Sequence, residues 1–331
     1  MNRYFLYFLC FVLSFLLTGL YRKFALKKAI LDVPNERSSH SVPTPRGGGL
    51  AIVIAFYLGV GYLFFKGDMD QKLFFALLTG IILVITGLFD DILSLTPLLR
   101  FSIQILVSGL AIYILGGLQT LELGFAVINQ PILLSIVAII GMVWFINLYN
   151  FIDGIDGYAG MQAVFVGLAI YFFTKSTTAL ILAIATLGFM PWNWQKAKIF
   201  MGDAGSTMLG FVIAVLGIYY QNTGSFSLVF WLVVTALFWF DASFTLFLRW
   251  KNKEKLSEAH RKHLYQRLVR SGWSHQQVVL LGLGLNLLLF CIVFITKIVA
   301  PEMLIVSLAF TLLVLFAWSW FVEKRFAFKK A

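Results

Sequence analysis

The stretch from residue 147 to residue 157, NLYNFIDGIDG, places two carboxylates and an amide directly behind a long apolar run, residues 131–145. Carboxylates are costly inside a bilayer, so acids in this place indicate either a membrane surface or a functional site. Asn150, Asp153 and Asp156 are spaced three apart, so a helical turn would bring all three onto one face. Two anions this close repel each other unless a cation or a donor-rich ligand lies between them. The two glycines of the stretch weaken a helix here and are expected to leave room for that ligand.

The composition of the chain predicts membrane insertion. Of its 331 residues, 60% are hydrophobic and only 12% are charged. Soluble domains are about 45–50% apolar, so lipid must cover much of this surface. Apolar segments long enough to span occur eleven times, near residues 4–20, 48–65, 72–89, 99–115, 131–148, 158–173, 178–192, 205–220, 227–247, 277–296 and 303–321. The sequence therefore predicts an all-α polytopic membrane protein of about eleven transmembrane helices, forming one integral-membrane domain over residues 1–331.

Lysine and arginine are distributed unevenly between the two alternating sets of loops. Of the 26 basic residues, 21 lie in or beside one set, which also carries Asp90, Asp91, the acids of the opening stretch, Asp203 and all four histidines. An excess of Lys and Arg marks cytoplasmic loops. We therefore expect the N-terminus outside, the C-terminus in the cytoplasm, and an active site on the cytoplasmic loops. The net charge of +11 then reflects membrane topology, and nucleic acid is not an expected partner.

Two further acidic motifs fall on the same predicted face, and each has a plain structural alternative. Asp90 and Asp91 close the third span, where one could act as a general base and the other as a metal or phosphate contact. The alternative is a polar helix end that anchors the span. Asp203, in the sequence FMGDAGS, precedes the eighth span and could bind a metal beside free backbone N–H groups. Its alternative is an ordinary helix cap.

The longest cytoplasmic loop carries His260, Arg261 and His263, with Arg267 close behind. Two histidines three apart lack a third soft ligand for zinc, so an anion site for phosphates is the better functional interpretation. A basic turn resting on anionic headgroups is the alternative.

Basic residues also punctuate the stiff loop before the second span. Arg37, His40 and Arg46 are interspersed there among prolines and glycines, which favours a functional loop over a plain linker. Asp241, inside the ninth span, is interpreted as functional by default. A structural hydrogen bond across helices is its alternative.

Five ordered stretches carry a resemblance to a known family. They are Pro34-Asn-Glu-Arg37-Ser-Ser-His40 through Pro45-Arg-Gly-Gly48, Asp90-Asp91, Asn150-Phe-Ile-Asp-Gly-Ile-Asp-Gly157, Met201-Gly-Asp-Ala-Gly-Ser206 and His260-Arg-Lys-His263. Together they resemble the polyprenyl-phosphate N-acetylhexosamine-1-phosphate transferase family, of glycosyltransferase 4 type, over nearly the whole chain. The histidine motif looks closer to the O-antigen-initiating branch than to the phospho-muramoyl-pentapeptide translocase, which carries a run of histidines there. A peptide-bearing donor is therefore not expected.

The resemblance implies an enzyme that transfers an N-acetylhexosamine 1-phosphate from a UDP-sugar to undecaprenyl phosphate and releases UMP. It implies Mg²⁺ as the cofactor, with Mn²⁺ as the alternative, and a place in lipopolysaccharide or cell-wall biogenesis at the bacterial inner membrane. The implied roles are catalysis for Asp90 and Asp91, nucleotide-sugar binding for Asn150, Asp153 and Asp156, phosphate or sugar binding for Arg46, His260, Arg261 and His263, and metal binding for Asp203. The identity of the sugar, the choice between a one-step and a covalent mechanism, and homodimer formation stay open.

A secondary transporter is the competing hypothesis, because intramembrane acids are typical of that class. Transporter sites lie near the bilayer midplane between structural repeats. In this sequence the motif acids gather on one face and no repeat is evident, which favours the enzyme.

Overall fold

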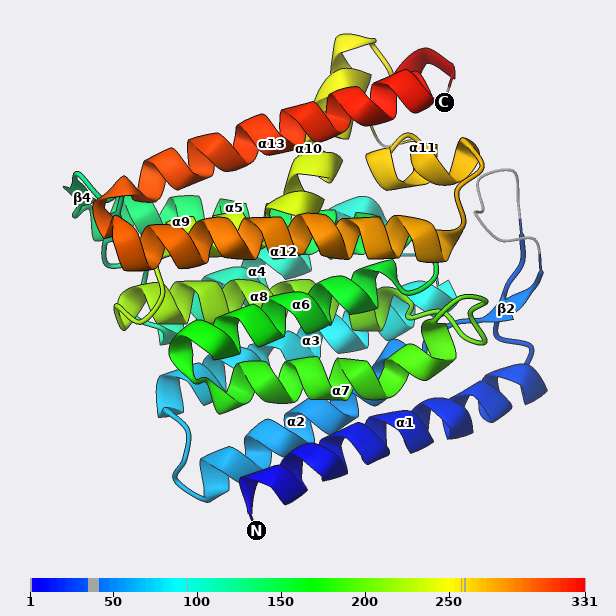
Figure 1. Ribbon diagram of the computed structural model, residues 1–331. Coiled ribbons are helices and arrows are strands. Elements are labelled where there is room, and N and C mark those ends of the chain that lie inside the picture. The colour runs from blue at the N-terminus through cyan, green and yellow to red at the C-terminus, as the bar shows by residue number, and fades with distance from the viewer. Residues whose placement is uncertain (1, 35–41, 94, 257, 259, 331) are drawn as a thin grey trace.

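The computed structural model describes residues 2–34, 42–93, 95–256, 258 and 260–330, with the backbone alone at residues 91, 92 and 330. Arg37 and His40 lie outside these residues. The helices are α1 Arg3–Lys27, α2 Gly49–Phe65, α3 Gln71–Leu93, α4 Pro97–Ile114, α5 Pro131–Phe151, α6 Tyr158–Thr174, α7 Thr177–Asn193, α8 Asp203–Asn222, α9 Leu228–Val234, α10 Ala236–Lys251, α11 Leu264–Arg270, α12 His275–Val299 and α13 Leu304–Arg325 (Figure 1). Two short 3-10 helices, η1 Pro301–Met303 and η2 Phe328–Lys330, flank α13. Two antiparallel pairs of two-residue strands complete the fold, β1 Leu31–Asp32 with β2 Thr44–Pro45, and β3 Leu121–Glu122 with β4 Val127–Ile128.

Each of the eleven apolar segments falls on a helix or, for residues 227–247, on the successive helices α9 and α10. Within the described residues, seven helices are long and apolar enough to cross a membrane, or eight if α9 and α10 form one span. The helices α2, α6 and α7 are apolar but shorter, with 17 residues each. The chain is thus a multi-pass helical membrane protein, while the number of eleven spans and their orientation stay predictions.

The helix boundaries follow from local sequence signals. Thr96 caps α4 by accepting a hydrogen bond from the backbone N–H of Leu99, and prolines occupy the first turns of α4 and α5. Proline suits this position because its missing N–H would have no partner there. At the start of α12, Ser274 and Gln277 form a reciprocal capping box. These signals fix where each long apolar helix begins.

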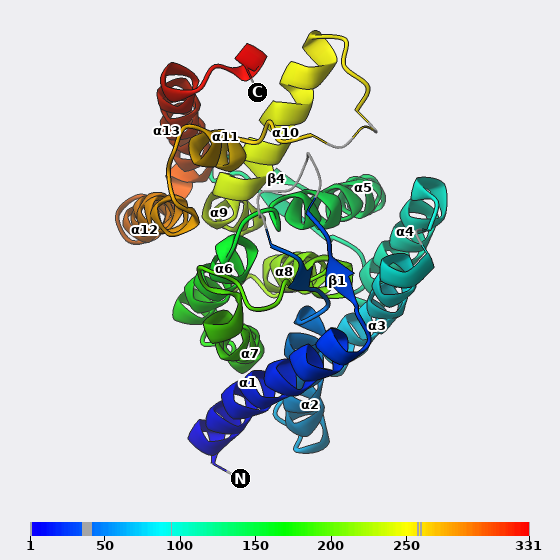
Figure 2. The same cartoon turned by 90° about the vertical axis from the view of Figure 1, so that its right-hand side faces the viewer.

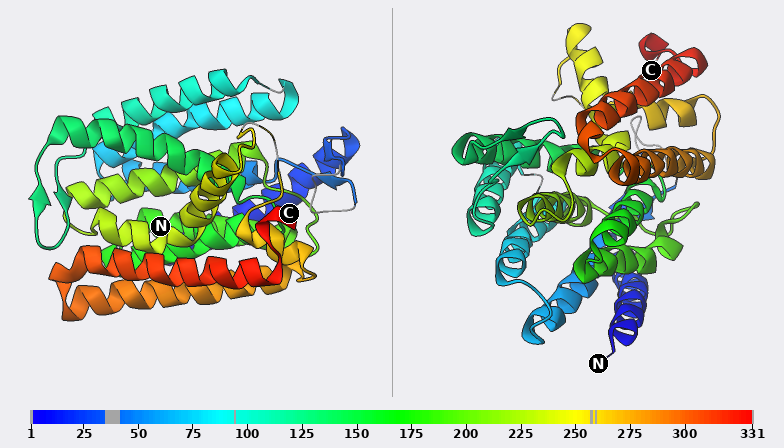
Figure 3. Two further views of the ribbon diagram at one scale, coloured as in Figure 1. Left: turned by 90° about the horizontal axis from the view of Figure 1, so that it is seen from above. Right: turned by 60° about the vertical axis from the view of Figure 1, so that its left-hand side comes forward.

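The loops gather at two opposite ends of the bundle. Figure 1 shows β2, α11 and the end of α13 at one end and β4 at the other. Seen from above, α12 and α13 form one flank and α3 and α4 the opposite flank (Figure 3). The motif-bearing loops therefore share one end, as the alternation of polar and apolar segments predicts.

Helix α8 lies at the centre of the bundle, among α2, α3, α5 and α6 (Figure 2). It is buried along nearly its whole length, unlike the outer helices. Small residues allow this close packing: a Cβ on Gly205 would lie 2.7 Å from the Cα of Gly49 in α2. The first residue of this central helix is Asp203, so the predicted metal ligand lies at the start of the most buried of the candidate membrane spans among the described residues.

The ninth predicted span is not a single straight helix. Helices α9 and α10 meet at an angle of 76° around Thr235. At the break, the indole Nε1–H of Trp239 donates to the carbonyl of Leu232, and the Thr235 hydroxyl donates to the carbonyl of Trp231. These side chains satisfy carbonyls near the break, which makes a sharp bend tolerable in an apolar setting. After the bend, α10 rises across the direction of α12 and α13 instead of running along it (Figure 1).

Candidate active site

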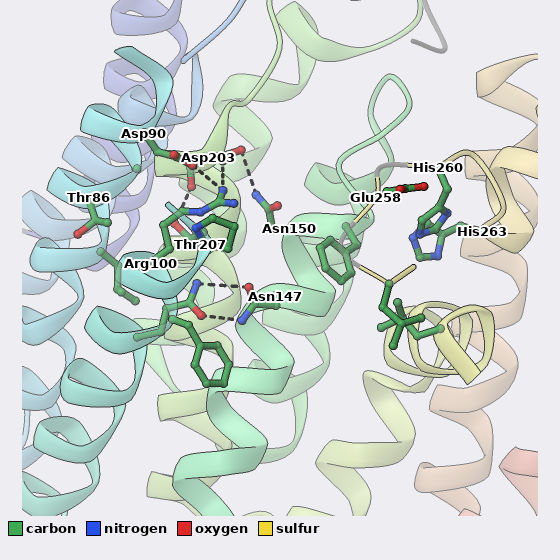
Figure 4. A pocket seen from close by; sticks show the side chains of 18 of the residues that line it. Thr86, Asp90, Arg100, Asn147, Asn150, Asp203, Thr207, Glu258, His260 and His263 are labelled. Carbon is green, nitrogen blue, oxygen red and sulfur yellow. Dashed lines mark hydrogen bonds and ion pairs between the residues drawn. The ribbon is translucent and has the colours of Figure 1, made fainter. Parts of the chain in front are cut away.

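The start of α8 opens into a cleft of about 460 Å³ at the end of the bundle that carries the motifs. Figure 4 shows two groups of polar side chains facing each other across it. We call the group from α3, α4, α5 and α8 the acidic wall; it holds Asp90, Arg100, Asn150 and Asp203. The group from the loop between α10 and α11 is the histidine wall; it holds Glu258, His260 and His263.

Asp203 and Asn150 form the centre of the acidic wall. The Asn150 amide, near the end of α5, donates to Asp203 Oδ1 at 3.1 Å and to the Ser206 hydroxyl at 2.8 Å. The amide therefore holds one carboxylate oxygen in place, while the Asp203 side chain keeps 37% of its surface exposed. This arrangement leaves an oriented carboxylate open to the cleft.

Asp90 reaches the acidic wall from α3 and is paired with Arg100 of α4. Arg100 Nη1 lies 2.6 Å from Asp90 Oδ2 and 3.8 Å from Asp203 Oδ2, while Asp90 Oδ1 accepts from the backbone N–H of Leu95. One guanidinium thus lies between two carboxylates and reduces their repulsion. Arg100 is not among the site residues that the sequence predicts. Arg100 follows Asp90 by ten residues, and this spacing indicates a contact between them only when the turn between α3 and α4 is known.

Asp91 follows Asp90 in α3, and its side chain lies outside the part of the chain that the structure describes. Of the predicted catalytic pair, only the Asp90 side chain is therefore placed in the acidic wall.

Glycines bring the backbones of the acidic wall together. A Cβ on Gly87 of α3 would lie 2.6 Å from the backbone nitrogen of Ala204, so only glycine lets α3 approach the start of α8 this closely. On the other side, the N–H of Gly48 donates to the Phe200 carbonyl and the N–H of Phe200 to the Pro45 carbonyl. The glycine run at the start of α2 therefore lets the chain pack closely against the backbone of the segment before α8.

A pair of hydrogen-bonded amides lies deeper in the cleft, below the acidic wall. Asn147 Nδ2 donates to Gln104 Oε1 at 2.6 Å and to the Val143 carbonyl at 2.8 Å, and Gln104 Nε2 returns a weak contact of 3.5 Å to Asn147 Oδ1. Gln104 lies one turn along α4 from Arg100, and Asn147 one turn along α5 from Asn150. This amide pair therefore sets the spacing of the two helices that carry the charged groups above it.

On the histidine wall, His260 is a neutral hydrogen-bond donor toward the cleft. Its Nδ1 accepts from the backbone N–H of Lys262 at 3.2 Å, so the proton of the neutral ring lies on Nε2. Burial, with smaller contributions from the nearby His263 and Arg249, lowers the pKa of His260 to about 3. A neutral Nε2–H can donate to an oxygen of a bound substrate without a charge of its own.

His263 is 3% exposed and has a different environment. Its Nδ1 lies 3.5 Å from Asp241 Oδ1, a distance without hydrogen-bond geometry, and its ring stacks on that of Tyr265. Asp241 accepts from the backbone N–H groups of Leu264 and Tyr265 at 2.8 and 3.2 Å, and so caps the start of α11. The structural alternative for Asp241, a hydrogen bond across elements, is therefore the one that the structure shows.

The three polar residues of the opening stretch do not share one face, contrary to the prediction from their spacing. Helix α5 ends at Phe151, and Asp153 and Asp156 lie in the turns that follow. Neither residue is among the described residues that line the cleft. Asp156 Oδ2 instead accepts from the backbone N–H of Ala197 and lies 3.3 Å from His275 Nδ1. A change of chain direction, which the three-residue spacing does not reveal, separates Asn150 from Asp156.

The glycines of this stretch also differ from their predicted use. Gly157 has φ +75° and begins α6 as a left-handed turn residue. A Cβ on Gly154 would lie 2.2 Å from the Tyr265 hydroxyl, which donates to the Phe151 carbonyl at the end of α5. The room at Gly154 is therefore filled by the protein itself, and the prediction that it accommodates a ligand is wrong.

The predicted basic contacts are divided between the cleft and the protein interior. Arg46 and Arg261 are half-buried, and neither is among the described residues that line the cleft. Arg267 is 1% exposed, its Nε donates to the Phe326 carbonyl at 2.8 Å, and its guanidinium pairs with Glu323. The interpretation of Arg267 as part of a phosphate site is therefore wrong, because its donors are used within the fold.

Oxygen donors dominate the candidate metal position. Asp203 offers a partly exposed carboxylate, and the Asn150 amide and the Asp90 carboxylate lie close to it. Hard oxygen ligands suit Mg²⁺, which also retains water and substrate phosphate oxygens. Among the described residues there is no group of three or more His, Cys, Asp or Glu that could hold a metal by itself. An ion at Asp203 would therefore take most of its ligands from water and substrate.

The fold and the cleft define a multi-pass helical membrane protein with an acid- and histidine-lined site at one end of its bundle. Residues 73–221 match the family described as Glycosyl transferase family 4. A protein of Bacillus subtilis named as a probable undecaprenyl-phosphate N-acetylglucosaminyl 1-phosphate transferase is 31% identical over 287 residues, which cover 80% of this chain and 76% of that protein. The decaprenyl-phosphate N-acetylglucosaminephosphotransferase of Mycobacterium tuberculosis is 30% identical, covering 82% of this chain and 76% of that one.

A third relative, the undecaprenyl-phosphate alpha-N-acetylglucosaminyl 1-phosphate transferase of Escherichia coli O157:H7, is 28% identical over 83% of this chain and 80% of its own length. The chain belongs to the glycosyl transferase family 4, and it is therefore an enzyme. This confirms the resemblance that the five ordered motifs carry. The individual residue roles that the resemblance implies stay predictions.

Proposed function

We propose that this enzyme transfers an N-acetylhexosamine 1-phosphate from a UDP-sugar to undecaprenyl phosphate and releases UMP, at the cytoplasmic face of a bacterial inner membrane. The three relatives are named as N-acetylglucosamine-1-phosphate transferases of undecaprenyl phosphate or decaprenyl phosphate. The observation that carries the proposal is the cleft itself, in which Asp203, Asp90 and Arg100 face His260 at one end of an apolar bundle. The product would begin a lipid-linked unit of a surface polysaccharide such as O-antigen.

The chemistry is the attack of one phosphate on another. An oxygen of the lipid phosphate forms a bond to the sugar-bearing phosphorus, and the bond from that phosphorus to the bridging oxygen breaks, so that UMP leaves. Several negative oxygens converge in this step, so catalysis depends on fixed positive and hydrogen-bonding groups. Mg²⁺ held at Asp203 would supply charge neutralisation at the diphosphate.

The residues of the two walls have complementary parts in this proposal. Arg100 can pair with the attacking phosphate at the cost of its contact with Asp203, which at 3.8 Å is the looser of its two ion pairs. Asp90 and Asp91 stay the candidates for the base near that phosphate, and Asn150 holds Asp203 in orientation. Across the cleft, the Nε2–H of His260 can donate to a diphosphate or sugar oxygen.

An apolar groove next to the cleft suits the chain of a polyprenyl acceptor. The groove has a volume of about 460 Å³ and is lined by α5, α8, α9, α10 and α13, including Trp144, Leu148 and Ser243. Phe151 and Leu246, each one turn further along α5 and α10, line the cleft instead. An isoprenoid chain in the groove would thus present its phosphate to the acidic wall.

Asp203→Asn tests the proposal. Purified protein in lipid nanodiscs would be given undecaprenyl phosphate, Mg²⁺ and each of several UDP-N-acetylhexosamines, and UMP release would be measured. We expect release with at least one donor in the wild type and a loss of at least about 100-fold in the variant, on the scale of removing one preorganised electrostatic group. Asp68→Asn, which changes an acid paired with Arg3 on α1, is the matched control and should stay active. No UMP from any donor in the wild type, or full activity in Asp203→Asn, would refute the proposal.

A further inference from the structure

The segment after α13 folds back against α11 and the histidine wall. Arg267 of α11 is almost fully buried, and it binds the Phe326 carbonyl and the Glu323 carboxylate. The same carboxylate accepts from the backbone N–H of Phe328 at 3.1 and 3.2 Å, and the Phe328 side chain is only 6% exposed. We call Glu323, Phe326 and Phe328 the C-terminal seat.

Lys262 connects this seat to the histidine wall. Its Nζ lies 5.0 Å from the centre of the Phe328 ring and 2.7 Å from Glu254 Oε1, and its side chain is about one-fifth exposed. Its backbone N–H donates to His260 Nδ1. The same residue therefore anchors its side chain away from the cleft and fixes the ring of His260 within the cleft.

Glu254 is itself held from behind. Arg249, which is 3% exposed at its side chain, donates from Nε to Glu254 Oε2 at 3.1 Å and from Nη2 to the Glu258 carbonyl at 3.1 Å. Lys262 thus lies between a fixed carboxylate and a buried aromatic face, and both favour its cation. A partly desolvated cation in such a position has little freedom to turn toward the cleft.

The basic residues of the 260–267 segment are therefore divided by the direction of their side chains. His260 and His263 line the cleft, whereas Lys262 and Arg267 point to the C-terminal seat. Lys262 is not an ordinary surface charge, because it contacts both the Phe328 ring and the Glu254 carboxylate. Its backbone bond to His260 links this anchoring to the site.

We propose that Lys262 and Phe328 are positioning residues for the active site: together they hold the 260–263 turn so that His260 faces the substrate cleft. This inference rests on the proposed function only for its catalytic consequence. The anchoring itself can be measured without catalysis. It also assigns a purpose to Phe328, which lies 66 positions after Lys262 and which none of the recognised motifs includes.

The experiment uses Phe328→Leu and Lys262→Met, which keep apolar volume but remove the ring or the cation, in full-length protein in nanodiscs. Hydrogen exchange of the backbone amides of residues 260–263 is the first readout, and we expect it to accelerate in both variants. Phe328→Tyr and Lys262→Arg should keep wild-type exchange. Lys297→Met is the control, because Lys297 lies 5.4 Å from the centre of the Phe173 ring, at the end of α12 opposite to the histidine wall. It should leave both exchange and activity unchanged.

Turnover is the second readout. We expect Phe328→Leu to lower kcat about tenfold while KM for undecaprenyl phosphate is unchanged, the size expected when a desolvated cation–π contact no longer holds the turn. In a His260→Ala background the same substitution should have no further effect, because the group that it positions is gone. An unchanged exchange rate in both variants would overturn the inference, as would a tenfold loss that persists without His260. If the wild type releases no UMP, the proposed function fails, and the exchange readout still decides the anchoring.

Discussion

The amide pair between Gln104 and Asn147 gives a test of how the acidic wall is spaced. Substituting Gln104 by Leu removes the 2.6 Å hydrogen bond from Asn147 Nδ2 and the weak 3.5 Å return contact. Asn147 keeps its bond to the Val143 carbonyl, so only one strong hydrogen bond is lost. Such bonds are worth about 0.5–1.5 kcal/mol in soluble proteins, and about 0.6 kcal/mol on average in membrane helices with a maximum near 1.7. We therefore expect a destabilisation of about 1 kcal/mol.

Expressed as free energies, the loss of transition-state stabilisation in Gln104→Leu should exceed the loss of folding stability. Loss of the pair frees α4 to shift against α5, which moves Arg100 relative to Asn150, and displacements of about 1 Å can cost about 100-fold in rate. The assay combines thermal unfolding in nanodiscs with UMP release for Gln104→Leu, Asn147→Leu and the double variant. A coupled pair predicts a double variant no worse than the poorer single variant. Strictly additive losses, or a Gln104→Leu protein with wild-type turnover, would refute the idea that the pair sets the spacing.

Three further predictions concern packing, capping and protonation. Gly87→Ala should destabilise the protein by about 1–3 kcal/mol and reduce turnover, because its Cβ meets the backbone of Ala204. Gly61→Ala within α2 has nothing within 4 Å of its Cβ, so it should not lower the melting temperature, because alanine is the better helix former. Asp241→Asn should cost about 2–3 kcal/mol of unfolding free energy by removing an acceptor from the start of α11; lost turnover at unchanged stability would instead indicate a chemical role. The pKa of His260, about 3, lies below its unfolded value, so the neutral ring stabilises the fold fully above about pH 6.5 and progressively less as pH falls toward 3. His260→Gln should remove this pH dependence from the melting temperature, and equal pH dependence in both proteins would contradict the assignment.

The sequence predicted the positions of the helices well, because a bilayer demands long apolar segments and the punctuating residues mark their ends. It did not predict the bend at Thr235. Hydropathy does not reveal which group donates a hydrogen bond to a backbone carbonyl. At Leu232 the donor is the indole of Trp239 and not an N–H of the next helical turn. The three shorter helices, α2, α6 and α7, also show that apolar composition locates a helix more reliably than it establishes a span.

The candidate site was predictable in its members but not in their partners. Asp203, Asp90 and Asn150 stood out as acids and an amide in apolar surroundings, and they meet at the acidic wall. Arg100 could not be found from spacing, since it reaches Asp90 only through the turn between α3 and α4. The prediction that Asp156 shares a helix face with Asn150 is wrong, because it assumes helical periodicity beyond Phe151, where α5 ends.

In the histidine loop, the sequence predicts the kind of charge but not the direction in which each side chain points. A run of positive charge predicts an anion site, but the direction of each side chain depends on what lies behind the loop. Arg267 and Lys262 are directed by Glu323 and Phe328, which follow about 60 residues later in the chain. Local sequence contains no trace of that contact.

The two walls of the cleft are held by different kinds of contact, and this bears on how the enzyme could be redesigned. The acidic wall combines side-chain pairs with close backbone packing, since a Cβ at Gly49 or Gly87 would collide with the main chain of α8. Exchangeable side chains hold the described part of the loop between α10 and α11, residues 252–256, 258 and 260–263, through Arg249, Glu254 and Lys262. A graft of that loop from another member of the family would therefore be a modular change, provided that the residues matching Glu323–Phe328 are transplanted with it.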